Sequence, residues 1–250
     1  AGMSAILLPR LLDRPVSTIG HLAGSTALIA LIVFDLFSAT MGRSNYDPIP
    51  AADRLPEPAI VAELQSTLEP GARIDGRRRG IMENYGTLYA VPDIHTISPL
   101  RLGSIERLVN LPDDRVWEVL AVQTVLTDWQ ELMAPSTISG TAEDVYGPYN
   151  IHQLDDPRPF AHLTYSARVV SSDDEAYAIL GEPTYAVQLI REIALLEHDP
   201  GIALPDAIPD NPGQTTVTRF EPEQITIQAE TAAPAVLTVA LPDYPGWQVT

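Results

Sequence analysis

The sequence predicts an α+β protein with one N-terminal transmembrane helix, then a mixed α/β layer, then antiparallel strands that resemble a β-sandwich truncated at the C-terminus. Three observations lead to this fold class. Residues 16–34 contain no Asp, Glu, Lys or Arg. Helical and strand-like hydrophobic patterns are mixed between residues 59 and 199. Beyond residue 200 the apolar side chains alternate, as they do in half-buried strands.

The apolar stretch near the N-terminus has the length of a membrane span. As a helix it would extend about 28 Å, close to the hydrocarbon thickness of a bilayer. Arg10 and Arg14 precede it, which favours a cytoplasmic location for residues 1–15. We therefore expect a transmembrane helix over residues 16–38. Asp35 would lie at the outer membrane edge, where its carboxylate can reach water or a partner.

Two other interpretations of this stretch stay open. Residues 22–34 carry most of the hydrophobicity, so the helix could be buried in a soluble domain. The stretch could also be a cleaved signal peptide that starts at Met3 and ends near Ser38 and Ala39. Asp35, at the end of the apolar run, fits a signal peptide less well, so the sequence favours the membrane helix.

Composition excludes several classes of function. The chain has 15 basic and 33 acidic residues, a formal charge of −18, and all of its basic residues are Arg. The charges of residues 1–42 cancel, so the whole excess belongs to residues 43–250. Such a polyanion is repelled by phosphate backbones, which excludes nucleic acid as a partner. The absence of Cys excludes disulfides, thiolate nucleophiles and Cys-ligated zinc.

A linker and an outer α+β domain are expected next. Residues 39–58 are rich in proline and lack periodicity, which is typical of a linker. Within the domain at 59–199, helical spacing predicts helices and β-branched or aromatic content predicts strands. The expected helices cover residues 58–69, 98–109, 116–121 and 171–180. The expected strands cover residues 73–75, 87–91, 123–127, 149–154, 161–170 and 185–190.

A second, β-rich domain is expected at residues 200–250, after a proline-rich boundary. Alternation predicts antiparallel strands at residues 217–220, 224–230 and 235–241. The pattern that starts at residues 244–250 has no closing strand. We therefore interpret the domain as incomplete and the chain as a fragment of a longer polypeptide.

Several polar residues are candidates for a site. Asp93 and His95 are two residues apart after a strand, so both could face one side and hold a metal; the alternative is a polar strand end. Arg77, Arg78 and Arg79 could meet an anionic lipid or phosphate, or could form a solvated loop paired with carboxylates. The pairs of adjacent aspartates resemble nucleotide-sugar signatures but fit helix caps and turns better (Asp113-Asp114, Asp155-Asp156 and Asp173-Asp174).

The aromatic residues near the C-terminus are a further candidate. Tyr244 and Trp247 could stack on a sugar or acceptor ring, although aromatics in a Pro-Gly turn more often fill a core. No glycine-rich phosphate loop and no nucleophile elbow occurs in the chain. We therefore assign no catalytic, cofactor-binding or metal-ligating residue, and we expect no cofactor.

Several segments together resemble the C-terminal part of the YfhO-like bacterial membrane proteins. The most distinctive is an apolar strand that runs into Tyr-Pro-Gly-Trp at residues 244–247. The looser ones are a helix that ends in Asp-Leu at residues 35–36, an Arg-Ile strand before Asn-Tyr-Gly at residues 84–86, a Ser-Pro-Leu at residues 98–100, and a helix that leads into a strand over residues 119–127.

The resemblance implies a parent protein with many membrane passes, related to GT-C glycosyltransferases that use lipid-linked sugars. The catalytic carboxylate of such enzymes lies in an early outer loop, so no catalytic residue is transferred to this chain. We expect an extracytoplasmic C-terminal region that helps to position a cell-envelope acceptor and is not catalytic by itself. Whether the parent protein is an enzyme stays open. The expected location is the bacterial cell membrane, with residues 39–250 outside the cytoplasm. The expected partners are the lipid bilayer, a lipid-linked sugar and a cell-envelope polymer.

Two other functional classes stay open. The chain could be a single-pass, membrane-anchored binding or interaction module without enzymatic activity. It could also be a soluble hydrolase whose N-terminal helix is buried, although no nucleophile–base pair is visible in the sequence.

Overall fold

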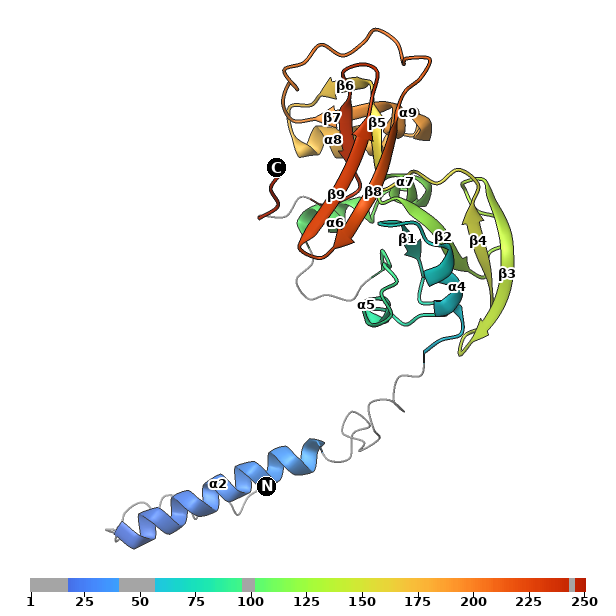
Figure 1. Ribbon diagram of the computed structural model, residues 1–250. Coiled ribbons are helices and arrows are strands. Elements are labelled where there is room, and N and C mark those ends of the chain that lie inside the picture. The colour runs from blue at the N-terminus through green and yellow to red at the C-terminus, as the bar shows by residue number, and fades with distance from the viewer. Residues whose placement is uncertain (1–17, 41–56, 96–101, 243–245) are drawn as a thin grey trace. The chain divides into compact units, whose positions relative to one another are not determined.

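The computed structural model describes residues 18–40, 57–95, 102–242 and 246–250. The chain divides into two compact units, Ala1–Pro56 and Glu57–Thr250, and each is described by itself. In the first unit the described residues form a single helix, α2 (Thr18–Thr40) (Figure 1). The second unit contains all the other described elements.

The prediction of a transmembrane helix is wrong. A helix does form at the expected place, but no helix among the described residues is both long and apolar enough to cross a membrane. The uninterrupted apolar part of α2, residues 27–34, would extend only about 12 Å, against roughly 30 Å for a bilayer core. Ser25 and Thr26 precede this run and Asp35 ends it. The predicted cytoplasmic segment and most of the predicted linker lie outside the described residues.

The second unit is built from short helices and strands in mixed order (Figure 1). Its helices are α4 (Ile60–Thr67), α5 (Tyr85–Leu88), α6 (Gly103–Leu108), α7 (Asp113–Val119), α8 (Asp173–Gly181) and α9 (Val187–Glu192). Its strands are β1 (Arg73–Asp75), β2 (Val122–Thr127), β3 (Ser136–Asp144), β4 (Gly147–Leu154), β5 (Ala161–Thr164), β6 (Ser166–Val169), β7 (Ile193–Leu196), β8 (Gln214–Glu221), β9 (Gln224–Glu230) and β10 (Val236–Val239).

The central sheet has four strands in the order β1-β2-β4-β3. β1 runs parallel to β2, whereas β4 is antiparallel to both of its neighbours. Strand β2 is covered on both faces, because Leu126 packs in a core cluster with α4 while Val122 and Val125 pack in a cluster with α6 and α7. Burial on both faces agrees with the burial of five of its six residues, Thr124 and Thr127 included.

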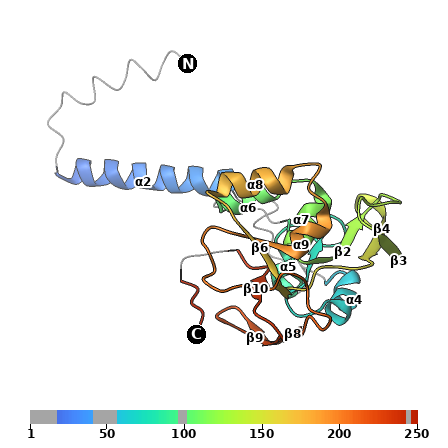
Figure 2. The ribbon, with the colours of Figure 1, turned by 90° about the horizontal axis from the view of Figure 1, so that it is seen from above.

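The remaining strands form three pairs, namely β5 with β10, β6 with β7, and β8 with β9. The hairpin of β8 and β9 is seen in Figure 2. A third core cluster, around Phe160, Ala161 and Ala240, joins this hairpin to the β5–β10 pair. The Phe160 ring also meets Phe220 edge-on, with 5.2 Å between the ring centroids. A glycine is required at position 71, because φ is +84° and a Cβ there would lie 2.4 Å from the Phe160 ring.

Most of the predicted elements are confirmed within a few residues. These include the helices at α4, α7 and α8 and the strands at β1, β2, β4, β8 and β9. Ser172 caps α8, since its side chain accepts a hydrogen bond from the Glu175 backbone N–H. The start predicted for the helix at 98–109 falls on residues that the structure does not describe, and its described part is α6.

Two predicted strands are helices. The strand expected at 87–91 is replaced by α5 and a turn, because Asn84 and Ala90 have positive φ angles, which extended chain does not accept. The strand expected at 185–190 is replaced by α9, in which Val187 and Ile190 share one face at three-residue spacing.

The strand pairing also differs from the predicted sandwich. β10 pairs with β5, so the C-terminal strands do not form a sheet of their own. The single strand expected at 161–170 is divided into β5 and β6, which pair with different partners. Strand β3 was missed because it lies at the sheet edge, where its residues are mostly polar and none is buried.

The double-sided burial of β2 predicts a large effect of truncation there. Leu126→Ala should lower the free energy of unfolding by about 2–5 kcal/mol, because Leu126 is fully buried and the surrounding core cannot collapse into the space. Urea unfolding followed by far-UV circular dichroism measures this change. Leu237→Ala is the control, because its side chain is largely exposed and its loss should change stability far less.

Candidate functional site

A buried carboxylate, Asp75, is the centre of a polar cluster at the C-terminal end of β1. The residue is 1% exposed. Its Oδ2 accepts hydrogen bonds from Trp117 Nε1 at 2.7 Å and from Arg77 Nε at 3.1 Å. Its Oδ1 lies 2.8 Å from Nε2 of His95. Side chains from three separate segments of the chain therefore meet at one carboxylate.

The backbone brings the segment 93–95 beside the end of β1. Ile74 and Asp93 form an isolated parallel bridge. Asp93 Oδ1 then accepts hydrogen bonds from the backbone N–H groups of Gly76, at 3.1 Å, and His95, at 2.9 Å. A Cβ at position 76 would lie 2.4 Å from Asp93 Oδ2, so only glycine allows this close approach.

Arg77 connects the cluster to the surface in a strained conformation. Both Arg77 and Arg78 have left-handed backbone angles, with φ of 45° and 65°. The Arg77 guanidinium also forms an ion pair with Asp113 at 2.6 Å, and it lies 4.5 Å from the centroid of the Trp129 ring. Strained non-glycine residues beside a desolvated charge are a recurrent feature of functional sites.

The cluster shifts the protonation of three groups. Burial raises the pKa of Asp93 to about 6. The contact with the Asp75 carboxylate raises the pKa of His95, and the same contact, with Arg77 and Trp117, outweighs burial and lowers the pKa of Asp75. The His95 side chain is 40% exposed and one of its nitrogens is held by a carboxylate. The His95–Asp75 pair therefore has the arrangement of an acid–base group, although His95 lines none of the three cavities described below.

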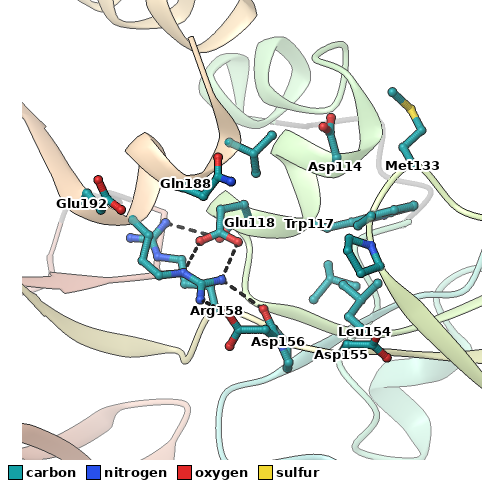
Figure 3. A pocket seen from close by; sticks show the side chains of 16 residues that line it. Asp114, Trp117, Glu118, Met133, Leu154, Asp155, Asp156, Arg158, Gln188 and Glu192 are labelled. Atoms are coloured by element: carbon teal, nitrogen blue, oxygen red, sulfur yellow. Dashed lines mark hydrogen bonds and ion pairs between the residues drawn. The ribbon is translucent and has the colours of Figure 1, made fainter.

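Trp117 also lines a cavity of about 540 Å³ between α7 and α9 (Figure 3). The volume is that of a small-ligand site. Its apolar walls include Met133, Pro135, Leu154 and Val187. Because the Trp117 indole is held by Asp75, the polar cluster fixes one wall of the cavity.

The polar groups of this cavity form an ordered network at its inner side. Arg191 binds both carboxylate oxygens of Glu118, at 2.8 and 2.9 Å, and the Asp156 carboxylate at 2.7 Å. The Glu118 and Asp156 interactions raise the pKa of Arg191 above its usual value. Asp114, Asp155, Gln188 and Glu192 also line the cavity, and its five carboxylates and two guanidiniums give a formal charge of −3.

Two other cavities are less suited to a polar ligand. One, of about 680 Å³, is a groove with mostly aliphatic walls between α6, α8, β7 and β10. The other, of about 660 Å³, lies beside α5 and is lined by Asp93 and the Phe220 ring. The cavity between α7 and α9 is the one in which an ordered set of charged groups faces open space, and we treat it as the candidate site.

The structure brings together some of the residues that the sequence singled out. Asp93 and His95 do lie on one side of β1, but the described residues contain no group of three His, Cys, Asp or Glu side chains that could hold a metal ion. Arg77 and Arg79 bind carboxylates, Asp75 and Asp144 respectively, as the loop alternative expects, but their side chains are only 21% and 14% exposed and so are not solvated.

The three aspartate pairs lie at helix starts and in a bend, as the alternative of caps and turns predicts. Asp173 and Asp174 lie in the first turn of α8, and Asp113 and Asp114 lie in the first turn of α7. The pair at 155–156 forms a bend directly after β4. In addition, Asp113 forms an ion pair with Arg77, and Asp114 and the pair at 155–156 line the cavity.

The residues proposed for a sugar contact and a membrane edge are not part of this site. Tyr244 lies outside the described residues. Trp247 is 41% exposed and lines none of the three cavities. Asp35 belongs to α2, in the other unit, and the role predicted for it depended on the transmembrane helix.

Sequence reasoning missed the residues that build the site, namely Asp75, Trp117, Glu118, Arg158 and Arg191. The Trp-Glu pair of α7 gave no signal either, because a charged residue beside a large apolar one is ordinary in an amphipathic helix. Arg158 and Arg191 lie in segments that have no motif.

Comparisons with protein-family models, with curated proteins and with solved structures find no match to this chain. The resemblance to YfhO-like proteins therefore stays a prediction, and the site must be interpreted from its own chemistry.

Removal of the central carboxylate should be strongly destabilising. Asp75→Ala leaves the Trp117 N–H and the Arg77 guanidinium without their buried acceptor, which we expect to lower the free energy of unfolding by about 3–5 kcal/mol. Asp113→Ala removes the more exposed partner of the same arginine and should cost less than about 1 kcal/mol. Equal effects of the two variants in urea unfolding would contradict the central role of Asp75.

The raised pKa of Asp93 predicts a pH-dependent contribution to stability. Because its folded-state pKa, about 6, lies above its ordinary value of 3.8, Asp93 adds stability that is complete below pH ~4 and lost as the pH rises through about 6. Asp93→Asn removes this dependence and keeps an oxygen that accepts both backbone hydrogen bonds. Relative to the parent chain, the variant should therefore gain up to about 2 kcal/mol between pH 4 and pH 8.

The quantity to compare is the difference in unfolding free energy between Asp93→Asn and the parent chain at each pH. Burial lowers the pKa of His162 to about 4, so His162 makes stability rise between pH 4 and 6.5, opposite to Asp93. The His162 effect is common to both chains and cancels. A difference in unfolding free energy that stays constant from pH 4 to 8 would show that Asp93 titrates normally.

Proposed function

We propose that the Glu57–Thr250 unit is a saccharide-binding module that holds a polyhydroxylated ligand in the cavity between α7 and α9. The observation that carries this proposal is the combination, in one cavity of about 540 Å³, of apolar walls with many fixed carboxylate, amide and guanidinium groups. Binding is proposed, and no chemical step is assigned to the chain.

The lining suits hydroxyl groups, which both donate and accept hydrogen bonds. Asp114, Asp155 and Glu192 provide acceptors, whereas the Gln188 amide provides a donor as well. The apolar surfaces of Met133, Pro135 and Leu154 can pack against the C–H faces of a sugar ring. Because the Glu118–Arg191 pair fixes the inner wall, the site is arranged before the ligand arrives, which lowers the entropy cost of binding.

This proposal agrees with the role that the family resemblance implies, the positioning of an acceptor by a domain that is not itself catalytic. A cell-envelope polymer as the acceptor, a lipid-linked sugar as the donor and a location outside the cytoplasm are further proposals that depend on that resemblance alone. An interaction module without enzymatic activity, the other class that the sequence left open, is also consistent with a binding cavity.

Isothermal titration calorimetry of the full chain with neutral oligosaccharides tests the proposed function. We expect saturable binding with one site per chain. Gln188→Ala should weaken binding about three- to tenfold, since it removes one hydrogen-bonding group from the lining. Gln188 is exposed, so this change should leave stability nearly unaltered.

The matched control is Gln228→Ala, which makes the same chemical change on strand β9, outside the three cavities. It should leave binding unchanged. The proposed function fails if no saccharide in a broad panel binds, or if both glutamine variants weaken binding equally.

A further inference from the structure

Arg158 is a buried cation without a carboxylate in direct contact. The residue is 6% exposed and lines the cavity between α7 and α9. Its Nε donates to His162 Nδ1 at 3.2 Å and its Nη1 to the backbone carbonyl of Glu118 at 3.3 Å. Both acceptors are uncharged, because the lowered pKa of His162 keeps that ring neutral at pH 7.

The carboxylates nearest to Arg158 bind another arginine. Both oxygens of Glu118 bind Arg191, and Asp156 binds Arg191 as well. Among the described residues no carboxylate lies within ion-pair distance of Arg158. A buried guanidinium without a counter-ion in contact is costly, and the cost shows in its pKa, which burial lowers to about 10.

One nitrogen of Arg158 is open. Nη2 donates no hydrogen bond to any described residue. Nη2 is not fully buried either. Among the described residues, the fully buried side-chain nitrogen and oxygen atoms without a hydrogen bond are Asp75 Oδ1 and Arg79 Nε, and each of these has an ion-pair partner. Nη2 therefore faces the open space that Arg158 lines.

We propose that Arg158 binds an acidic group of the ligand, so that the module selects saccharides that carry a carboxylate, such as uronic acids, over neutral ones. This inference depends on the proposed function and names its ligand class. The open Nη2 atom gives the carboxylate a charge-assisted hydrogen bond, which is stronger than a hydrogen bond between neutral groups.

The rest of the lining favours a carboxylate over a phosphate. Asp114, Asp155 and Glu192 line the same cavity, and its formal charge is −3. A singly charged carboxylate directed at Arg158 tolerates these neighbours better than a doubly charged phosphate does. The acids thus restrict the anionic group to one that is small and singly charged.

Arg158 also lines the aliphatic groove, so its open nitrogen has a second possible ligand there. A fatty acid would suit that groove, because its chain would contact the aliphatic walls. The proposal places the acidic group in the polar cavity, and the experiment includes octanoate to separate the two locations.

The experiment measures binding to the full chain by calorimetry for four probes: an oligoglucuronide, the same oligosaccharide with its carboxyl groups reduced to alcohols, inorganic phosphate and octanoate. We expect the oligoglucuronide to bind about 10- to 100-fold more tightly than its reduced form. Arg158→Gln should remove this preference, so that the variant binds the two oligosaccharides with equal affinity. Arg158→Lys, which keeps the charge, should retain part of it.

Arg107→Gln is the control, because it removes a cation of the same kind from α6, outside this cavity. It should leave the preference intact. Circular dichroism verifies that each variant is folded, and the comparison of the two oligosaccharides on the parent chain does not depend on any variant.

The outcomes separate the two proposals. Equal binding of the two oligosaccharides by the parent chain overturns the role of Arg158 and leaves the saccharide-binding function standing. Absence of binding by both overturns the function and the inference together. Phosphate or octanoate could bind more tightly than the oligoglucuronide. If Arg158→Gln loses this tighter binding, Arg158 is assigned to a different ligand, and only the inference is overturned.

Discussion

The arrangement of the second unit depends on one buried carboxylate. Asp75 accepts hydrogen bonds from the side chains of Trp117 and Arg77 and contacts His95. These residues come from the turn after β1, from the segment 93–95 and from α7, which local sequence does not otherwise connect. In the low-dielectric interior each contact is strong, and each would be costly to leave unmade. The carboxylate therefore fixes both the end of the parallel strand pair and the helix that forms a wall of the cavity.

A second polar network, built from arginines, defines the inner side of the same cavity. Glu118 and Arg191 neutralise one another with a bidentate geometry that suits guanidinium groups and not ammonium groups. The chain contains no lysine at all, so every internal cation has this planar, five-donor form. Such networks are rigid because each group has a fixed partner. Arg158, by contrast, has two long bonds to neutral acceptors and one open nitrogen.

The sequence pattern predicted the elements whose conformation depends on residues that are close together in the chain. The strand β2, the hairpin β8–β9 and the capped helix α8 follow from apolar content, alternation and a Ser-Asp-Asp start, and all three were predicted. The helix α9 was not, because a segment of six residues with three apolar side chains is compatible with both a strand and a helix, and tertiary packing selects between them. The site could not be predicted for the same reason: Asp75, Trp117, Arg158 and Arg191 are far apart in sequence. The transmembrane helix was predicted from the length of a stretch without charged residues, but Ser25, Thr26 and Asp35 limit its uninterrupted apolar part.

The position of the tryptophans gives the molecule an internal optical probe. The chain has three Trp residues, and two of them, Trp117 and Trp129, face the same guanidinium of Arg77, at 5.9 and 4.5 Å from the ring centroids. A fixed positive charge beside an indole alters the energy of its excited state. The ultraviolet emission of the protein should therefore report the integrity of the Asp75 cluster directly, without any attached dye.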